Sequence, residues 1–435
     1  MKPGKMLLRA VILITTGIIS CNTTNPPTPP GQPKAEITLE FEDVSCTEAW
    51  ITLTTKNLQL PTTVTLYKDT VGQTISLSTA DTVIYVDSLL PNQTYTFHTT
   101  IQSSSYASNE ITVTTMDTTS HDFTFETYTF GGTAGSSALY DVAIIDENNI
   151  WAVGEIYVAD ASQNGYTMYN AVHWDGSEWE LKTIPFLFQG DSFYNPIYAV
   201  FAFGPDDIWF GIGNLIYWDG LRYMPIEISS VFPSLVNKIW GTSSNDLYVV
   251  GNEGNIAHYE DGVWSKIESG TDLNINDIWG DYNEKTGEWE ILAVASNKFF
   301  NEGKSLLKIG GLITTELNTE GLPWSVSSVW FKAEKKYLIG GDGLFFNKML
   351  NESWNKDTTF IPIYKDRIRG TDVNDIVVSG SNGLFSHFNG FKWKHYTNNE
   401  LPYFSGRLLS SDLKDDVSTA VGWKDTQAII TMGKR

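Results

Sequence analysis

The stretch that decides the fold is Lys238-Ile-Trp-Gly-Thr-Ser-Ser-Asn-Asp-Leu-Tyr-Val-Val-Gly-Asn-Glu-Gly-Asn-Ile-Ala-His-Tyr-Glu-Asp-Gly-Val-Trp264. It has the pattern of four short β-strands separated by polar turns, with Asp261-Gly262 between the aromatic residues Tyr259 and Trp264. Asp-Gly between two β-rich runs favours a type I′ hairpin, because that turn needs positive φ at both central residues. The stretch therefore predicts a small antiparallel sheet.

The same landmarks recur through the C-terminal three quarters of the chain. The aromatic pairs that flank a tight turn return as Trp174/Trp179, Trp218/Tyr223 and Phe388/Trp393. The predicted first strands end at Trp240, Trp279, Trp330 and Arg369, which are 39, 51 and 39 residues apart. A period near 40 residues with four strands in each unit is typical of a β-propeller.

Counting the units predicts an all-β domain over residues 118–435 with seven blades. The seventh unit ends after three strands, the last of them at Gln427–Met432. We expect the strand-like segment Phe123–Phe130 to supply the missing fourth strand. This closure would pair the first strand of the domain with the last and remove an open sheet edge.

The N-terminal segment, residues 1–20, has the features of an export signal. Lys2, Lys5 and Arg9 precede an apolar run that is too short to cross a membrane, and this run ends in Ser20-Cys21. The segment resembles the signal of bacterial lipoproteins, which implies cleavage before Cys21 and lipidation of its thiol. The alternative is an ordinary secretory signal. Residues 21–34 contain closely spaced prolines and predict an extended linker.

Residues 35–117 contain seven short strand-like runs, which predict a β-sandwich. Trp50 in the second run and Leu89-Leu-Pro-Asn-Gln-Thr-Tyr95 resemble fibronectin type III domains, in which such a tyrosine closes a corner. The resemblance implies that the Tyr95 hydroxyl bonds to nearby backbone. A spacer is the expected role of this domain.

The motif Trp240-Gly-Thr-Ser-Ser-Asn-Asp-Leu-Tyr-Val-Val-Gly251 resembles the repeats of bacterial propellers of the two-component-regulator and Asp-box-like types. Such repeats specify a fold and carry almost no information about function. No nucleophile elbow, P-loop or dinucleotide fingerprint occurs in the sequence, so we predict no catalytic residue and no cofactor. His173, His258 and His387 fall at equivalent repeat positions, too far apart to share an ion, so we predict no metal site.

Two sets of residues are candidates for ligand binding. Arg367, Arg369 and Arg407 fall in neighbouring first strands near the predicted axis, where they could hold an anion. Trp240, Trp279 and Trp330 could stack on a ligand at the channel mouth. The alternatives are ion pairs for the arginines and packing between blades for the indoles, and we favour both. The segments 159–169 and 186–194 are the candidate surface loops.

The net charge of −22 becomes −25 when the three basic residues of the signal are removed. This charge argues against nucleic acid as a partner and against adsorption to anionic lipid other than through Cys21. The sequence thus predicts a monomeric, lipid-anchored binding protein of the cell envelope, at the outer membrane or cell surface of a Gram-negative cell. Its partner would be a protein or a glycan. A carbohydrate-active enzyme and a structural envelope component are the alternatives.

Overall fold

The computed structural model describes residues 34–101, 106–298, 300–397 and 399–435. The predicted signal, Cys21 and the linker up to residue 33 lie outside the described residues. In the part of the chain that is described, no helix is long and apolar enough to cross a membrane. The chain consists of two compact units, and each is described by itself.

The first seven strands of the described chain form two sheets, with the orders β1-β2-β5 and β4-β3-β6-β7. The strands are β1 (Glu36–Val44), β2 (Ala49–Lys56), β3 (Thr62–Lys68), β4 (Val71–Leu77), β5 (Asp81–Val86), β6 (Thr94–Ile101) and β7 (Ile111–Thr114). They lie where the sequence predicts strands. Trp50 is buried, and the Tyr95 hydroxyl accepts a hydrogen bond from the Leu90 amide at 2.9 Å, as expected for a tyrosine corner.

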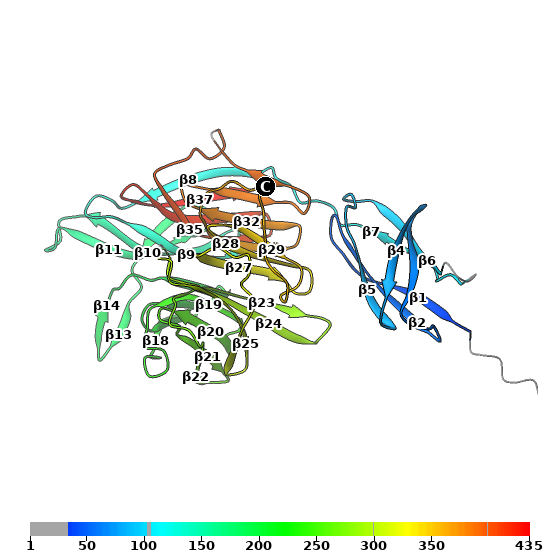
Figure 1. Ribbon diagram of the computed structural model, residues 1–435. Helices are drawn as coiled ribbons and strands as arrows, with labels where there is room; N and C mark the ends of the chain where they lie inside the picture. The colour runs from blue at the N-terminus through cyan, green and yellow to red at the C-terminus, as the bar shows by residue number, and fades with distance from the viewer. Residues whose placement is uncertain (1–33, 102–105, 299, 398) are drawn as a thin grey trace, which may run out of the picture. The chain divides into compact units, whose positions relative to one another are not determined.

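Within the described residues after 118, seven four-stranded antiparallel sheets follow one another (Figure 1). The first three are β9 (Ala138–Asp146), β10 (Asn149–Ala159), β11 (Tyr166–Trp174), β12 (Trp179–Lys182); β15 (Ala199–Gly204), β16 (Asp207–Gly211), β17 (Leu215–Trp218), β18 (Tyr223–Ile226); and β19 (Val236–Ser243), β20 (Asp246–Gly251), β21 (Ile256–Glu260), β22 (Val263–Ile267). The next two are β23 (Ile275–Asn283), β24 (Glu288–Ser296), β25 (Lys304–Gly310), β26 (Ile313–Glu316); and β27 (Val326–Lys332), β28 (Lys336–Gly341), β29 (Gly343–Asn347), β30 (Asn355–Lys356). The last two are β31 (Lys365–Asp372), β32 (Asp375–Gly380), β33 (Phe385–Phe388), β34 (Trp393–His395); and β35 (Gly406–Lys414), β36 (Val417–Lys424), β37 (Gln427–Lys434), β8 (Thr124–Phe130).

The turn between β21 and β22 shows how the sequence shapes these sheets. Asp261 and Gly262 have φ values of 47° and 91°, the combination that a type I′ turn requires. The turn sets Tyr259 opposite Trp264 across the hairpin, and their rings lie 5.0 Å apart. The predicted hairpin is therefore confirmed, and its aromatic pair covers the outer strands of the sheet.

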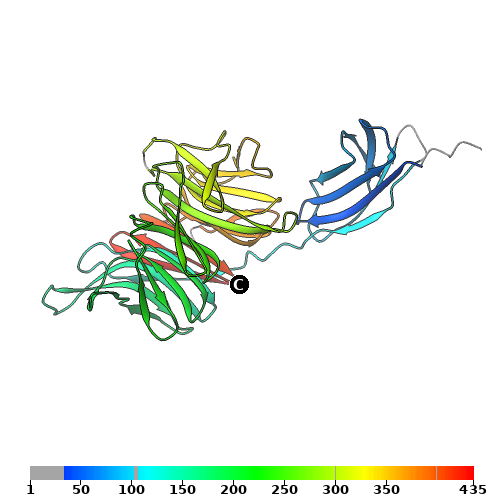
Figure 2. The ribbon, with the colours of Figure 1, turned by 90° about the horizontal axis from the view of Figure 1, so that it is seen from below.

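The sheets follow a ring that closes on itself. Each first strand contacts the next, from β9 to β15, β19, β23, β27, β31 and β35, and β35 contacts β9 again. As predicted, β8 pairs with β37, in a register that runs from Phe130 opposite Ala428 to Thr124 opposite Lys434. Figure 2 shows the sheets from a second direction. The architecture is thus all-β with propeller-like blade sheets.

The core lies between neighbouring sheets. Trp240 of β19 packs with Ile278 of β23, and Trp330 of β27 packs with Ile368 of β31. Trp330 is only 1% exposed, and its indole donates to the Gly370 carbonyl at 3.0 Å. These large side chains fill the wedge between two twisted sheets, and their burial stabilises each inter-sheet contact by about 2–3 kcal/mol.

The two segments predicted as long loops contain strand structure. β10 continues to Ala159, which pairs with Tyr166 of β11, so the predicted 159–169 loop reduces to the turn between these strands. Residues 186–194 contain a separate hairpin, β13 (Phe186–Phe188) and β14 (Asp191–Phe193), which Figure 1 shows apart from the four-stranded sheets. The alternation of apolar and polar residues is too short in these segments to show strands in the sequence.

Candidate functional site

A cavity of about 680 Å³ opens at one end of the ring of first strands. Its wall is rich in asparagine and carries both charges. The lining residues are Tyr140, Tyr198, Asn237, Asn252, Glu253, Asp272, Asn274, Asn276, Asn297, Lys298, Phe300, Glu302, Asp366, Arg367, Arg407 and Leu409. Clefts of this volume are typical of ligand sites.

Recurrent β-bulges in the first strands form much of this wall. In β19 the pairing with β20 passes from Val236 to Lys238, so Asn237 has no partner across the ladder. The same offset occurs at Tyr140, Asn276 and Asp366 in β9, β23 and β31. A bulge adds one residue to a strand and redirects its side chain. Each of these four side chains lines the cavity.

The residue after each bulge belongs to a buried ionic layer. Lys238 Nζ lies 2.6 and 2.7 Å from the two carboxylate oxygens of Asp141. Arg369 donates from Nη2 and Nη1 to the two oxygens of Asp277 at 2.7 and 3.0 Å, and Arg367 Nη1 lies 2.5 Å from Asp277 Oδ1. All five side chains are at most 5% exposed. Buried charges persist only when they are paired and hydrogen-bonded, and this layer meets that condition at both carboxylates.

Asp277 accepts four hydrogen bonds, two of them from Arg369. Its Oδ2 accepts the other two, from the Ser328 hydroxyl at 2.6 Å and from the Val329 amide at 3.1 Å. Burial opposes ionisation of this carboxyl, but Arg367 and Arg369 outweigh that effect and hold its pKa below the ordinary value. Asp277 is therefore a carboxylate that joins the sheets of β23, β27 and β31.

Three cationic side chains line the cavity, and one of them, Arg367, also belongs to the ionic layer. Arg407 donates to both oxygens of Asp366, at 3.1 Å from Nε and at a shorter distance from Nη2. Arg367 is 5% exposed, and its Nε and Nη1 form no hydrogen bond with a described residue; the contact of Nη1 with Asp277 pairs charges but is not aligned as a hydrogen bond. Lys298 is half-buried, and burial together with Arg367 and Arg407 lowers its pKa to about 8, against the opposing effect of Asp366.

The six predicted ligand-binding residues separate into two groups. Arg367 and Arg407 line the cavity, and Arg369 shares the ionic layer with Arg367 without lining the cavity. The tryptophans do not line the cavity. Trp240 and Trp279 border a small pocket of about 70 Å³ with Phe201, Lys238 and Arg369, and Trp330 is enclosed between sheets. The predicted ion pairs of Arg367, Arg369 and Arg407 are present, and so is the packing of Trp240 and Trp330.

Sequence reasoning missed Lys298 and the bulge residues. Lys298 follows β24 in a connection whose length varies between repeats, so no repeat position points to it. Asn237, Asn276 and Asp366 do leave a signal, because each stands three positions before the residue that marks the predicted end of its first strand. Asn237 precedes Trp240 by three, and Asp366 precedes Arg369 by three. An alignment of the repeats on these strand-end residues would have identified the bulge residues that line the cavity.

The repeat histidines have structural partners. His173, His258 and His387 each bond through Nε2 to the residue that opens the second strand of their own sheet, at 2.7 to 2.9 Å. These acceptors are Asn149, Asp246 and Asp375. The bonds connect the second and third strands of a sheet, which agrees with packing roles for the three imidazoles.

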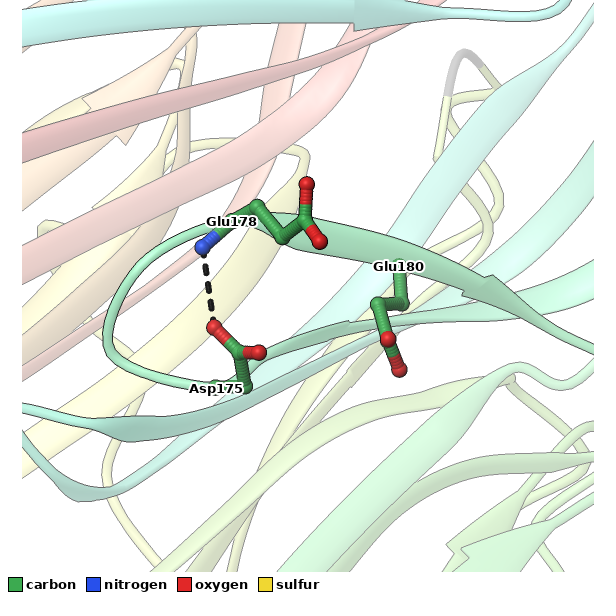
Figure 3. A group of neighbouring side chains, drawn as sticks. All are labelled: Asp175, Glu178 and Glu180. Atoms are coloured by element: carbon green, nitrogen blue, oxygen red, sulfur yellow. Dashed lines mark hydrogen bonds between the residues drawn. The ribbon is translucent and has the colours of Figure 1, made fainter.

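Figure 3 shows a group of carboxylates at the β11–β12 hairpin, of which Asp175 and Glu178 are exposed and Glu180 is half-buried. Asp175 Oδ1 already accepts from the amides of Ser177 and Glu178 at 2.8 and 2.9 Å, and these bonds lower its pKa to about 2. Glu180 pairs with Lys182. The carboxylates therefore stabilise a turn, and we assign no metal site to them.

Comparison with known proteins supports the architecture. No protein-family model and no curated protein matches the chain. Among solved structures, the chain is similar to YCF48 bound to D1 peptide, with 14% identity and a TM-score of 0.52 over 73% of this chain and 99% of that one. It is also similar to the WD40 β-propeller domain of Doa1, with 11% identity and a TM-score of 0.50 over 72% and 97% of the two chains. At these identities the likeness concerns the fold alone, and that fold is a β-propeller.

Proposed function

We propose that this chain is a peptide- or protein-binding β-propeller whose binding site is the cavity at the bulged ends of the first strands. The observation that carries the proposal is the cavity itself, whose lining combines asparagine amides with Arg367 and Lys298. Amide side chains match the donors and acceptors of a peptide backbone. YCF48, a solved structure of similar fold, is described as bound to a peptide, which is consistent with this use of a propeller.

The finer architecture also belongs to the proposal. The seven four-stranded sheets would be the blades of a seven-bladed propeller, since their first strands close a ring from β35 back to β9. Residues 35–117 would be a fibronectin type III-like spacer, supported by the Tyr95 bond to the Leu90 amide. Lipidation of Cys21 would anchor the chain in the cell envelope, at the outer membrane or cell surface of a Gram-negative cell, as a monomer. Incorporation of labelled palmitate into the wild-type chain, but not into Cys21→Ser, tests the anchor.

A carbohydrate-active enzyme is the second candidate, because burial raises the pKa of the cavity residue Asp366, as a general acid requires. We favour binding over catalysis, since both oxygens of this carboxylate accept hydrogen bonds from Arg407. A glycan partner remains part of the test for the same cavity.

The experiment is a screen of the purified full chain against a peptide array and a glycan array. Asp272 is an exposed residue of the cavity wall, so Asp272→Trp places a bulky ring at the opening. Leu221→Trp, at a position that is 88% exposed and does not line the cavity, is the control. We expect peptide binding that Asp272→Trp weakens and Leu221→Trp leaves unchanged. Equal binding by both variants, or binding to glycans alone, would refute the peptide-binding proposal at this site.

A further inference from the structure

We propose that the inner wall of the cavity is a carboxylate-binding subsite, in which Arg367 and Lys298 hold a carboxylate of the bound peptide. The inference rests on the proposed function, because it names the chemistry of the ligand at that same site. Three independent features support it: donors without partners, local charge and the apolar surface beside the opening.

Arg367 supplies the first feature. It lines the cavity, 95% of its surface is buried, and its Nε forms no hydrogen bond with a described residue, whereas its Nη1 contacts Asp277. Buried donors without acceptors are unfavourable, and native proteins rarely keep them unsatisfied. A guanidinium whose donors lack a full set of acceptors attracts an anionic group at the cavity wall.

The local charge is the second feature. Asp277 contacts two guanidinium groups, those of Arg367 and Arg369, so it does not provide a separate carboxylate for each. Among the described residues, Lys298 has no carboxylate within ion-pair distance, and the cavity carboxylate Asp366 is bonded to Arg407. The inner wall therefore carries a positive charge that an anionic group of a ligand can neutralise.

The opening limits the charge of that ligand. Glu253, Asp272 and Glu302 also line the cavity, and all three are acidic. They would repel a multiply charged anion such as a phosphate ester more strongly than a single carboxylate. A ligand with one negative group and an otherwise neutral body fits this distribution.

The apolar surface beside the opening favours a peptide over a sugar acid. Tyr198 lines both the cavity and a neighbouring pocket of about 370 Å³ that also includes Phe186 and Leu235. The adjoining hairpin exposes Phe188 and Phe193, which are 41% and 46% accessible. A carboxylate at the inner wall would leave the preceding residues of a peptide to place apolar side chains over this surface.

The experiment compares two arrays of the same hexapeptides, one with free C-terminal carboxylates and one with amidated C-termini. Affinities of the best binders for the full chain are then measured by fluorescence anisotropy. Exchange of Asp and Glu for Asn and Gln within the peptides distinguishes a side-chain carboxylate from a terminal one. We expect removal of one of these carboxylates to weaken binding about tenfold or more, which is typical of a lost charge-assisted bond.

Protein variants complete the test. Lys298→Gln and Arg367→Gln should each weaken binding of the acidic peptide about tenfold and leave the amidated or neutral form unaffected. Lys266→Gln, on the outer strand β22, is the charge-matched control and should bind as the wild type does. Since Arg367 also contacts Asp277, Lys298→Gln gives the reading that does not depend on the ionic layer. If peptides bind with an affinity that changes neither when their carboxylates are removed nor in Lys298→Gln, this inference alone is overturned. If the chain binds oligogalacturonate but no peptide, or binds nothing, the proposed function is overturned as well.

Discussion

Asp277→Asn provides the most direct test of the buried ionic layer. The carboxylate accepts two hydrogen bonds from Arg369, one from Ser328 and one from the Val329 amide, and it contacts Arg367. The substitution keeps the shape of the side chain but removes the only charge that both arginines contact. Leaving a buried charge without its partner costs about 3–5 kcal/mol. A loss of this size is a large fraction of the stability of a domain.

Urea unfolding followed by tryptophan fluorescence measures this loss, because Trp50 is the only one of the 15 tryptophans that precedes residue 118. Asp272→Asn, at an exposed acidic position of the cavity wall, should change the free energy of unfolding by less than about 0.5 kcal/mol. Adding Arg369→Met to Asp277→Asn should cost less than the same change in the wild type, since the pair is then already broken. A loss below about 1 kcal/mol for Asp277→Asn would refute the view that the layer depends on this carboxylate.

Three further predictions concern the closure and the turns. Phe123→Ala removes a buried ring that packs edge-on against His387, and we expect urea unfolding to show a loss of about 3–4 kcal/mol, against little change for Phe391→Ala at an exposed turn. Burial, together with His387, lowers the pKa of His121 to about 4 from its ordinary 6.5. As the pH falls, the imidazole is therefore protonated in the unfolded chain before it is protonated in the folded one, and stability should fall as the pH drops from 6.5 toward 4. Melting temperatures at pH 7 and pH 5 check this, and His121→Gln should reduce the difference between them. Gly254 has φ +69°, and a Cβ there would lie 1.7 Å from a backbone oxygen, so Gly254→Ala should lower the melting temperature by several degrees; an unchanged value would contradict the geometry.

The repeat was predictable because turn chemistry and strand pattern agree within each unit. Asp261-Gly262 needs the φ values that it adopts, and the position of Phe123–Phe130 before the first unit indicated its pairing with the last. The cavity was harder to foresee. Its wall depends on bulges at Asn237 and Asp366, and a bulge displaces the alternation from which side-chain direction is inferred.

The candidate arginines also show how far side-chain positions can be predicted from the sequence. Arg367 and Arg369 stand two positions apart in one strand, and sequence places them on the same face. Both contact Asp277 in the ionic layer, as that placement predicts, but of the two only Arg367 also lines the cavity, which the sequence does not show. The position of Lys298 depends on an irregular connection, which no periodicity describes. The fold is therefore predictable from motifs that recur in every repeat, whereas the site depends on bulges and connections that depart from the repeat.

The pairing of β8 with β37 has a consequence for biosynthesis. The two strands lie at opposite ends of the propeller sequence, so β8 leaves the ribosome long before its partner exists. Until residues 427–434 emerge, β8 presents an unpaired edge and apolar rings such as Phe125 and Tyr128 to the surroundings. The last strand to be translated completes the ring, and a contact so distant in sequence is slow to form. A nascent chain of this protein should therefore depend on chaperones until β37 has emerged, and a truncation within β37 should yield an aggregation-prone open ring in place of a smaller stable propeller.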